Sequence, residues 1–459
     1  SIAGMAAASR STGDVAEGPT TGEAPLTPIQ HWFFENIQAE QHHWNQSRML
    51  TLGAETDRKS VEAALDGLLR RHDALRLTFP TGDGGRRQVF SAPSGAVPLR
   101  FEDVSGIVGP ARLARIEAAA AEVQAAGDLE QGPLARFALF DFGAGKGARL
   151  LIVIHHLLVD EVSWSVLLED LETLLQGREL PGRTASYGEW AKRLIAQASD
   201  PVMLGRHRFW LEQRESQSAN SGEWPWAESP HREGPGESRI VEPRPETARG
   251  VLKPAEGVQA QDLLLAALLT AWHAWCSRGE LFLHLEGHGR DAAPGLDASR
   301  TVGWFTTVFP VMLRLEDDAL GAVRRQLRAI PDKGASHGLL RHLSADPNLR
   351  ATLRKCGRPT VLFNYLGARG YAALPAADEP QGPARSPRTR RAYALEINAW
   401  VEDSRLRLSW TYDDEERARA AVEALIAAFG RELDTVSRTG FSLAGLSDDA
   451  MDELAGLLE

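Results

Sequence analysis

The stretch RLLIVIHHLLVDEVSW, residues 149–164, joins an apolar run to two histidines and an aspartate. An uninterrupted apolar run of this length predicts a buried β-strand that ends at His155 and His156. The residues that follow repeat apolar positions with helical spacing and predict a helix over 162–177. A strand end that meets a helix start can direct a catalytic side chain into a cleft.

The two histidines have three possible uses, namely packing, metal binding and proton transfer. Neighbouring strand residues point to opposite faces, so His155 and His156 rarely serve one ion. A two-histidine metal site also needs a close carboxylate on the same face, whereas Asp160 lies beyond the strand end. Both histidines could instead be satisfied core residues. Asp160, Ser163 and Trp164 at the helix start favour proton transfer by His156, with Asp160 as a structural carboxylate.

Length and composition limit the class of protein. The chain has 459 residues, which is too long for one ordinary core and predicts two domains or lobes. Its net charge of −11 disfavours a nucleic-acid partner. Its 2 cysteines form neither a disulfide framework nor a zinc site, which fits a reducing cytoplasm. No apolar run is long enough for a membrane span, and the start lacks a signal peptide.

The predicted elements indicate an α/β (α+β) protein with two lobes. Residues 1–24 are expected to form a tail and linker, and residues 25–215 the N-terminal lobe. Residues 216–249 are rich in Pro, Gly, Ser and Glu, so they are the expected connection. Residues 250–459 are then the C-terminal lobe.

Within the lobes, particular segments carry clear patterns. Thr27 and Pro28 predict a helix start, because threonine caps and proline fits the first helical position. LRLTF (75–79) and TVGWFTTVFPVMLRL (301–315) predict strands. ALEINAWVEDSRLRLSWTY (394–412) alternates on both sides of a polar turn and predicts a hairpin.

A second candidate site is LEGHGRD, residues 285–291. Glu286 follows an apolar strand, and a carboxylate there is partly desolvated, which raises its pKa toward the range useful for a general base. The glycines at 287 and 289 allow a sharp turn or a close approach to a ligand. A surface turn with a capped glutamate is the alternative.

A third pattern, FNYLG (363–367), places Asn364 and Tyr365 at a strand end. Both side chains can donate hydrogen bonds to a developing oxyanion, although such residues more often form a simple turn. The sequence has no serine nucleophile elbow, no phosphate-binding glycine loop and no convincing Cys–His pair. The remaining chemistry is proton transfer by His156 and Glu286.

Five motifs in one order resemble the epimerization domains of nonribosomal peptide synthetases, a branch of the condensation-domain superfamily. The resemblance runs from about Pro25 to the end of the chain. The motifs are LTPIQHWFF (26–34), HHLLVDEVSW with its HHxxxD core (155–164), LEGHGRD (285–291), RTVGWFTTVFP (300–310) and FNYLG (363–367).

The resemblance implies two chloramphenicol-acetyltransferase-like lobes in a V shape with a tunnel between them. The substrate would be an aminoacyl or peptidyl thioester on the phosphopantetheine arm of a peptidyl carrier. His156 and Glu286 would act as acid and base in inverting the α-carbon from L to D, with no metal or cofactor of the domain's own. SIAGMAAA (1–8) is similar to the last helix of a carrier domain. An upstream carrier and a downstream condensation domain are therefore the expected partners.

The resemblance also implies residues that support this pair, with Asp160 and Arg290 as an ion pair. The supporting residues are His155, Asp160, Ser163, Arg290, Asn364 and Tyr365. Departures from the family pattern are Glu161 for glycine, Ser165 for arginine, and Ser336 and His337 for glycine and tyrosine.

Rival interpretations remain at this stage. A condensation domain shares His156 and Asp160, a plant-type acyltransferase belongs to the same superfamily, and a docking domain would bind carriers without turnover. The run of Arg385, Arg388, Arg390 and Arg391 is either a basic patch for an acidic carrier or a solvated loop.

Overall fold

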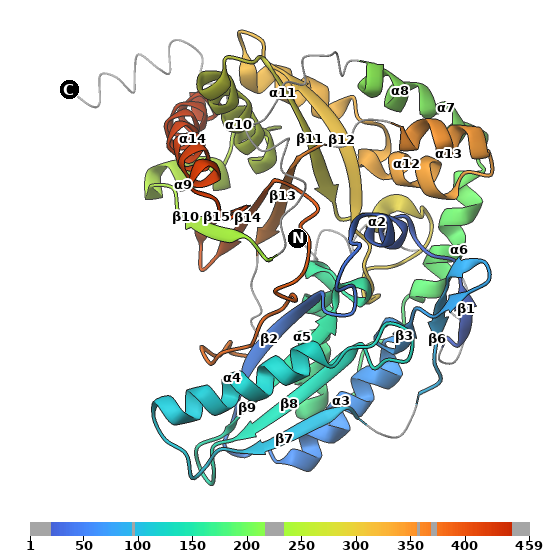
Figure 1. Ribbon diagram of the computed structural model, residues 1–459, viewed down its shortest axis with the longest axis vertical. Coiled ribbons are helices and arrows are strands. Elements are labelled where there is room, and N and C mark those ends of the chain that lie inside the picture. Colours follow the sequence, from blue (N-terminus) through green and yellow to red (C-terminus); the bar gives the residue numbers. More distant parts are fainter. Residues whose placement is uncertain (1–19, 94–96, 216–233, 356–358, 369–373, 443–459) are drawn as a thin grey trace.

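The computed structural model describes residues 20–93, 97–215, 234–355, 359–368 and 374–442. Figure 1 shows two lobes, a lower one drawn mostly in blue and teal and an upper one drawn mostly in yellow to red. The carrier-like start lies outside the described residues. None of the described helices has the length and apolarity that crossing a bilayer requires.

The N-terminal lobe is built on a four-stranded sheet with helices on both faces. In spatial order its strands are β2 (Asn45–Leu52), β9 (Ala148–His155), β8 (Ala135–Asp141) and β7 (Leu99–Asp103). Only β7 and β8 run parallel. The apolar faces of α3 (Arg58–Arg71) and α5 (Glu161–Leu175) pack on one side, and α4 (Pro110–Ala125) packs on the other. Strands that are covered on both faces have continuous apolar sequences, as residues 150–154 of β9 do.

Smaller elements complete this lobe. Helix α2 (Pro28–Asn36) begins at Thr27 as predicted, and the Thr27 amide donates to Gln30 Oε1 at 2.9 Å. The other elements are strands β1 (Gly22–Ala24), β3 (Leu77–Thr78), β4 (Thr81–Gly82), β5 (Gly85–Arg86) and β6 (Gln88–Phe90), and helix α6 (Tyr187–Ala198). Helices α7 (Pro201–Gly205) and α8 (His207–Glu215) follow, and α8 packs against the C-terminal lobe, where Trp210 is part of the core.

The C-terminal lobe holds a six-stranded sheet. In spatial order its strands are β10 (Glu237–Val241), β15 (Arg405–Tyr412), β14 (Leu395–Glu402), β13 (Val361–Ala368), β11 (Glu280–Gly287) and β12 (Thr307–Arg314). Helices α9 (Pro245–Leu252), α10 (Ala260–Cys276), α11 (Ala319–Arg328) and α14 (Glu416–Ser442) bury one face. Short helices α12 (Ala335–Gly338) and α13 (Pro347–Arg354) lie beside β12.

The hairpin predicted over 394–412 is confirmed as β14 and β15. Its apolar stripe, including Ile397 and Trp410, packs under α10 and α14. The alternate residues Asn398 and Ser409 turn toward the other lobe and line a cavity there. One face of this sheet thus packs in the core of the lobe, and the opposite face borders the cavity.

Two predicted strands differ in the structure. Residues 73–76 form a 3₁₀ turn, in which the Arg76 guanidinium donates to Asp73 Oδ1 at 2.9 Å, so only Leu77–Thr78 is strand. Residues 301–306 precede β12 and are held against the N-terminal lobe, where Thr301 Oγ1 donates to the Ala185 carbonyl at 2.6 Å. Side-chain contacts compete with sheet pairing in both cases.

The interval 216–249, expected to connect the lobes, contains elements of the C-terminal lobe. Its described part includes β10, which pairs antiparallel with β15, and the start of α9. Residues 237–249 therefore belong to the C-terminal lobe. Likewise, residues 22–24 of the expected N-terminal linker form β1, which pairs with β6.

A segment of the C-terminal half crosses to the N-terminal lobe. Residues 374–392, here named the crossing segment, run beside β2, whose outer edge would otherwise be unpaired. The Asn45 amide donates to the Ala384 carbonyl at 2.8 Å, and the Thr51 amide donates to the Pro375 carbonyl at 2.9 Å. The segment covers an exposed sheet edge and joins the two lobes.

Candidate active site

A cavity of about 380 Å³ lies between the lobes. His156 lines it from the N-terminal lobe, Glu286 and Asn364 line it from the C-terminal sheet, and Arg385 lines it from the crossing segment. Glu286 also borders a second cavity of about 500 Å³. The structure thus brings the two predicted acid/base residues to one space, from opposite lobes.

His156 is held between aromatic rings where β9 ends and a 3₁₀ turn begins. Its imidazole stacks on Trp44, with centroids 4.9 Å apart, and lies 4.4 Å from the Trp304 ring. Burial lowers the pKa of His156 to about 4, because an imidazolium is poorly solvated there. His156 is therefore neutral near pH 7, which is the form a general base needs.

Three contacts fix the tautomer of His156. Its Nδ1 lies 2.9 Å from the Val159 carbonyl, which only accepts, so Nδ1 carries the hydrogen. Gln46 Nε2 lies 3.0 Å from His156 Nε2. Trp164 Nε1 donates to Gln46 Oε1 at 2.6 Å, which turns the amide nitrogen toward the imidazole. His156 Nε2 consequently carries a lone pair.

His155 has a different environment from its neighbour. It is fully buried, its Nε2 donates to the Gln41 carbonyl at 2.8 Å, and its Nδ1 accepts from the Leu157 amide. Phe33 packs edge-on against the ring. Burial lowers the pKa of His155 to about 3. These contacts satisfy both ring nitrogens, so His155 is a packed core residue rather than a member of the cavity.

Glu286 lies at the end of β11, as the sequence predicts. Asn364 Nδ2 donates to its Oε2 at 2.6 Å across the adjacent strand β13. Burial, helped by the nearby Glu396 carboxylate and opposed by the charge of Arg385, raises the pKa of Glu286 to about 7. The expectation of a desolvated carboxylate is confirmed, and Glu286 exchanges protons near neutral pH.

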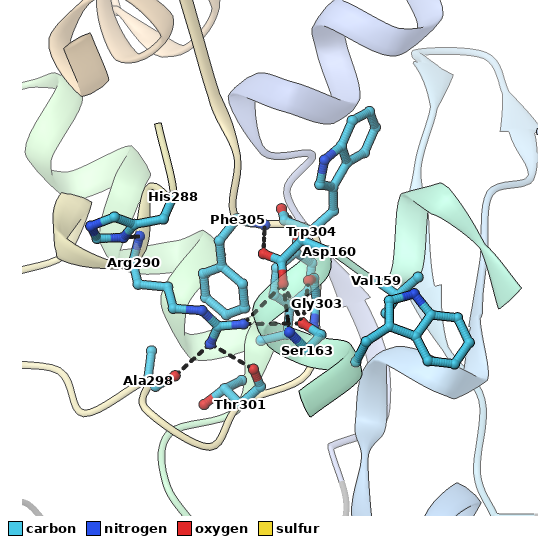
Figure 2. Close-up of polar contacts among 12 residues, drawn as sticks. Val159, Asp160, Ser163, His288, Arg290, Ala298, Thr301, Gly303, Trp304 and Phe305 are labelled. Carbon is cyan, nitrogen blue, oxygen red and sulfur yellow. Dashed lines mark hydrogen bonds and ion pairs between the residues drawn. The ribbon is translucent and has the colours of Figure 1, made fainter. Parts of the chain in front are cut away.

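The predicted ion pair between Asp160 and Arg290 is present and buried (Figure 2). Asp160 caps α5 by accepting from the Ser163 amide at 2.8 Å, and its other oxygen accepts from the Phe305 amide at 3.1 Å. Arg290 Nη2 donates to Asp160 Oδ1 at 3.2 Å. Asp160 therefore orders the loop after His156, which agrees with a structural role.

Arg290 also binds the chain that precedes β12. Its Nη1 donates to the carbonyls of Ala298 and Thr301, and its guanidinium lies 4.0 Å from the Phe305 ring centre. Ser163 adds a bond across the lobes, since its hydroxyl accepts from the Gly303 amide at 3.1 Å. Figure 2 shows these groups converging. They hold residues of both lobes beside the cavity.

The two predicted oxyanion donors are separated by the alternation of β13. Asn364 lines the cavity, but it already donates to Glu286. Tyr365 points to the other face and packs against the C-terminal core. The structure thus does not bring Tyr365 to the cavity, because adjacent strand residues face opposite sides.

The arginine run does not form one patch. Arg385 and Arg390 line the cavity, Arg388 is exposed and pairs with Glu40, and Arg391 is buried against Asp413. Neither the basic docking patch nor the solvated loop describes this ordered segment.

The residues that depart from the family pattern lie at different points of the structure. Glu161 lines the cavity and pairs with Arg48 at 3.1 Å. Ser165 is partly buried on α5. Ser336 and His337 are buried beside Trp210 and do not line this cavity.

Sequence reasoning missed Gln46 and Arg385. Gln46 acquires its role from the register of β2 on β9, in which it pairs with Ile154. Arg385 reaches the site only through the crossing segment. The available signal for Gln46 was its place in the apolar-polar stretch WNQSRML, which predicts a strand beginning beside the histidines.

Two lobes of mixed sheet and helix, with an HHxxxD loop at the cavity between them, define a condensation-type domain of the chloramphenicol-acetyltransferase-like fold. The chain belongs to the condensation-domain family, whose sequence profile matches residues 20–441.

Curated relatives are much longer proteins. The chain is 36% identical over 476 residues to a linear gramicidin synthase of Brevibacillus parabrevis, a match that covers 97% of this chain and 9% of that protein. It is 34% identical over 480 residues to a surfactin synthase of Bacillus subtilis, covering 96% and 13%. The chain thus spans about a tenth of these relatives' length.

Solved structures share the fold. The epimerization domain from the third module of tyrocidine synthetase B has a TM-score of 0.84 and 29% identity, covering 94% of this chain and 99% of that one. SgcC5 of Streptomyces globisporus has a TM-score of 0.67 and 17% identity, covering 90% and 98%. The second similarity concerns the fold alone.

Proposed function

We propose that this protein is an epimerization domain of a nonribosomal peptide synthetase. It converts the α-carbon of an aminoacyl or peptidyl thioester between L and D while the substrate is attached to the phosphopantetheine arm of a peptidyl carrier. The observation that carries the proposal is the presence of Glu286 and His156 on one cavity, from opposite lobes. The similarity to the tyrocidine synthetase domain supports it.

The protonation states suit an inversion. A thioester carbonyl has little resonance stabilisation, so its α-proton is more acidic than that of an amide. His156 is neutral with a lone pair on Nε2, and Glu286 has a pKa of about 7. One group takes a proton from one face of the α-carbon while the other delivers a proton to the opposite face.

In one direction, the α-hydrogen replaces the Gln46 amide as the partner of His156 Nε2. The proton moves to Nε2, and the C–H electrons pass toward the carbonyl oxygen. Glu286 in its carboxylic acid form then gives its proton to the other face, which leaves an imidazolium and a carboxylate. The reverse reaction starts from that pair. Each group contributes about 10²–10⁴-fold.

The proposed chemistry uses side chains alone, and the phosphopantetheine belongs to the carrier. An upstream carrier domain and a downstream condensation domain are the proposed partners, in a cytoplasmic assembly. The great length of the relatives supports such an assembly. A condensation domain is the second candidate, favoured by the His156 and Asp160 motif that it shares, but a buried acid at position 286 has no evident use in peptide-bond formation.

The deciding experiment is solvent exchange. A carrier loaded with an L-aminoacyl or L-peptidyl group is mixed with the protein in heavy water, and α-deuterium and D-isomer are measured together. Both are expected with the wild type and lost in His156→Ala and Glu286→Gln. Glu280→Gln, an exposed change on the same strand β11, is the matched control. Peptide-bond formation with a second carrier and no α-exchange would instead identify a condensation domain, and binding without turnover would identify a docking domain.

A further inference from the structure

The proposed inversion leaves one charge without a partner. As the α-proton departs, negative charge develops on the thioester oxygen, and enzymes place donors or cations where such charge appears. Asn364 already donates to Glu286, and Tyr365 faces the core. Another group in the cavity must therefore meet this oxygen.

Arg385 stands at this cavity on a well-held backbone. It forms an antiparallel bridge with Trp44, and the next residue, Ser386, donates its amide to the His43 carbonyl. The preceding carbonyl of Ala384 accepts from Asn45. Its position is thus fixed on both sides, although it lies more than 200 residues from the histidine motif.

The Arg385 side chain lies on the same indole as His156. Its guanidinium carbon is 4.9 Å from the Trp44 ring centre, and Trp44 also stacks with the imidazole of His156. A cation–π contact orients the group but leaves its N–H donors unused. Trp44 consequently presents a guanidinium to the cavity in which the base is held.

Those donors have no protein partner in the part of the chain that the structure describes. No carboxylate or carbonyl there accepts a hydrogen bond or ion pair from the Arg385 guanidinium. Arg388 and Arg391 of the same segment, in contrast, pair with Glu40 and Asp413. A partly buried guanidinium whose donors have no direct acceptor favours an anionic ligand as their partner.

Electrostatics places this charge near both proposed acid/base groups. The positive charge of Arg385 lowers the pKa of His156 and opposes the rise in the pKa of Glu286. A cation that acts on both groups lies within reach of a carbon held between them. The carbonyl oxygen of the thioester is two bonds from that carbon.

We propose that Arg385 is a catalytic residue that binds the thioester oxygen and stabilises the enolate. The inference rests on the proposed function. The electron pair of the broken C–H bond passes into the Cα–C bond while the carbonyl electrons move onto oxygen beside the guanidinium. When the opposite face is protonated, the carbonyl re-forms and no net charge is left on the substrate.

The oxygen anion could also belong to the phosphate of the carrier's arm, and the test separates the two. Exchange of α-deuterium is measured with a carrier-bound thioester and with a short pantetheine thioester that has no phosphate. Arg385→Met is expected to lower kcat about 10²–10³-fold on both substrates, with KM within about threefold. Arg385→Lys keeps the charge without the planar fork and is expected to lose about tenfold. Arg388→Met is the matched surface control and is expected to stay within about twofold.

A rise in KM confined to the carrier-bound substrate would show that Arg385 binds phosphate, and would overturn the proposal. Unchanged kinetics with both substrates would overturn it as well. If Arg385→Met does not fold, as checked by circular dichroism, the tenfold loss expected for Arg385→Lys decides. Absence of exchange by the wild type would remove the proposed function itself, whereas wild-type exchange with an unaffected Arg385→Met variant would remove only this assignment.

Discussion

Gln46 Nε2 lies 3.0 Å from His156 Nε2, and Trp164 determines which end of the amide meets the imidazole. The indole N–H can only donate, so it holds Gln46 Oε1 and turns the amide N–H toward His156. A protonated imidazole would place an N–H against that amide. The contact therefore favours the neutral base in addition to burial.

The first prediction reverses this preference. In Gln46→Glu a carboxylate faces Nε2, accepts from the imidazolium and raises the pKa of His156. We expect α-exchange to fall below the new pKa and to recover as pH rises through it. Side-chain ¹⁵N NMR of His156 gives the pKa directly. Gln176→Glu, an exposed change on the cap of α5, is the control and should move neither quantity; an unmoved His156 in Gln46→Glu would contradict the assigned contact.

The second prediction concerns stability and Glu286. Its pKa rises from 4.5 to about 7 on folding, so the folded state binds the proton more tightly than the unfolded chain. Tighter proton binding by Glu286 stabilises the folded state fully below about pH 4.5. This stabilisation is lost as pH rises to about 7, which lowers the free energy of unfolding by up to about 3 kcal/mol. Glu286→Gln lacks this decline. Its melting temperature relative to the wild type should therefore increase across that window and then level off.

The matched control for this titration is Glu280→Gln at the exposed end of β11. Its melting temperature should follow the wild type at every pH. A constant difference between Glu286→Gln and the wild type from pH 4.5 to 7 would show that Glu286 is not desolvated.

The third prediction concerns the buried pair of Asp160 and Arg290. Asp160→Ala leaves the Arg290 charge unpaired and removes the cap of α5, so a loss of about 3–5 kcal/mol is expected. Calorimetry or denaturant unfolding measures it. Glu62→Ala, which breaks the exposed pair with Arg58, should cost less than about 1 kcal/mol. A similar cost for both variants would mean that the buried pair contributes little.

The fourth prediction concerns Asn364 as the partner of Glu286. Its amide donates to the carboxylate and favours the charged form, so Asn364→Leu should raise the pKa of Glu286 above about 7. The limb of the pH profile for α-exchange that reports the titration of Glu286 should therefore move to higher pH. The same limb should be missing in Glu286→Gln, which identifies its origin. A limb that stays in place would assign it to another group.

The sequence was sufficient for features that depend on local pattern. The apolar runs before His156 and Glu286 predicted strand ends, and desolvation predicted the raised pKa of Glu286. The same alternation that places His155 and His156 in different surroundings also separates Asn364 from Tyr365. Period-two geometry could have predicted that only one of the latter two reaches the cavity.

Other features depend on contacts between distant parts of the chain. Gln46 meets His156 because β2 pairs with β9 in one register, and sequence periodicity does not determine register between strands. Arg385 reaches Trp44 because the crossing segment passes between lobes. Its four arginines look alike in the sequence, yet their surroundings give two to the cavity, one to the surface and one to the core.

The crossing segment has a practical consequence for recombining related domains. A junction placed only within residues 216–233 would separate β2 from the residues of the crossing segment that cover its edge, while Arg385 would come from the other parent. A chimera should therefore take residues 374–392 and the N-terminal half of the chain from the same parent. Lobe exchange along the linear order of the chain would divide the folding unit at the wrong place.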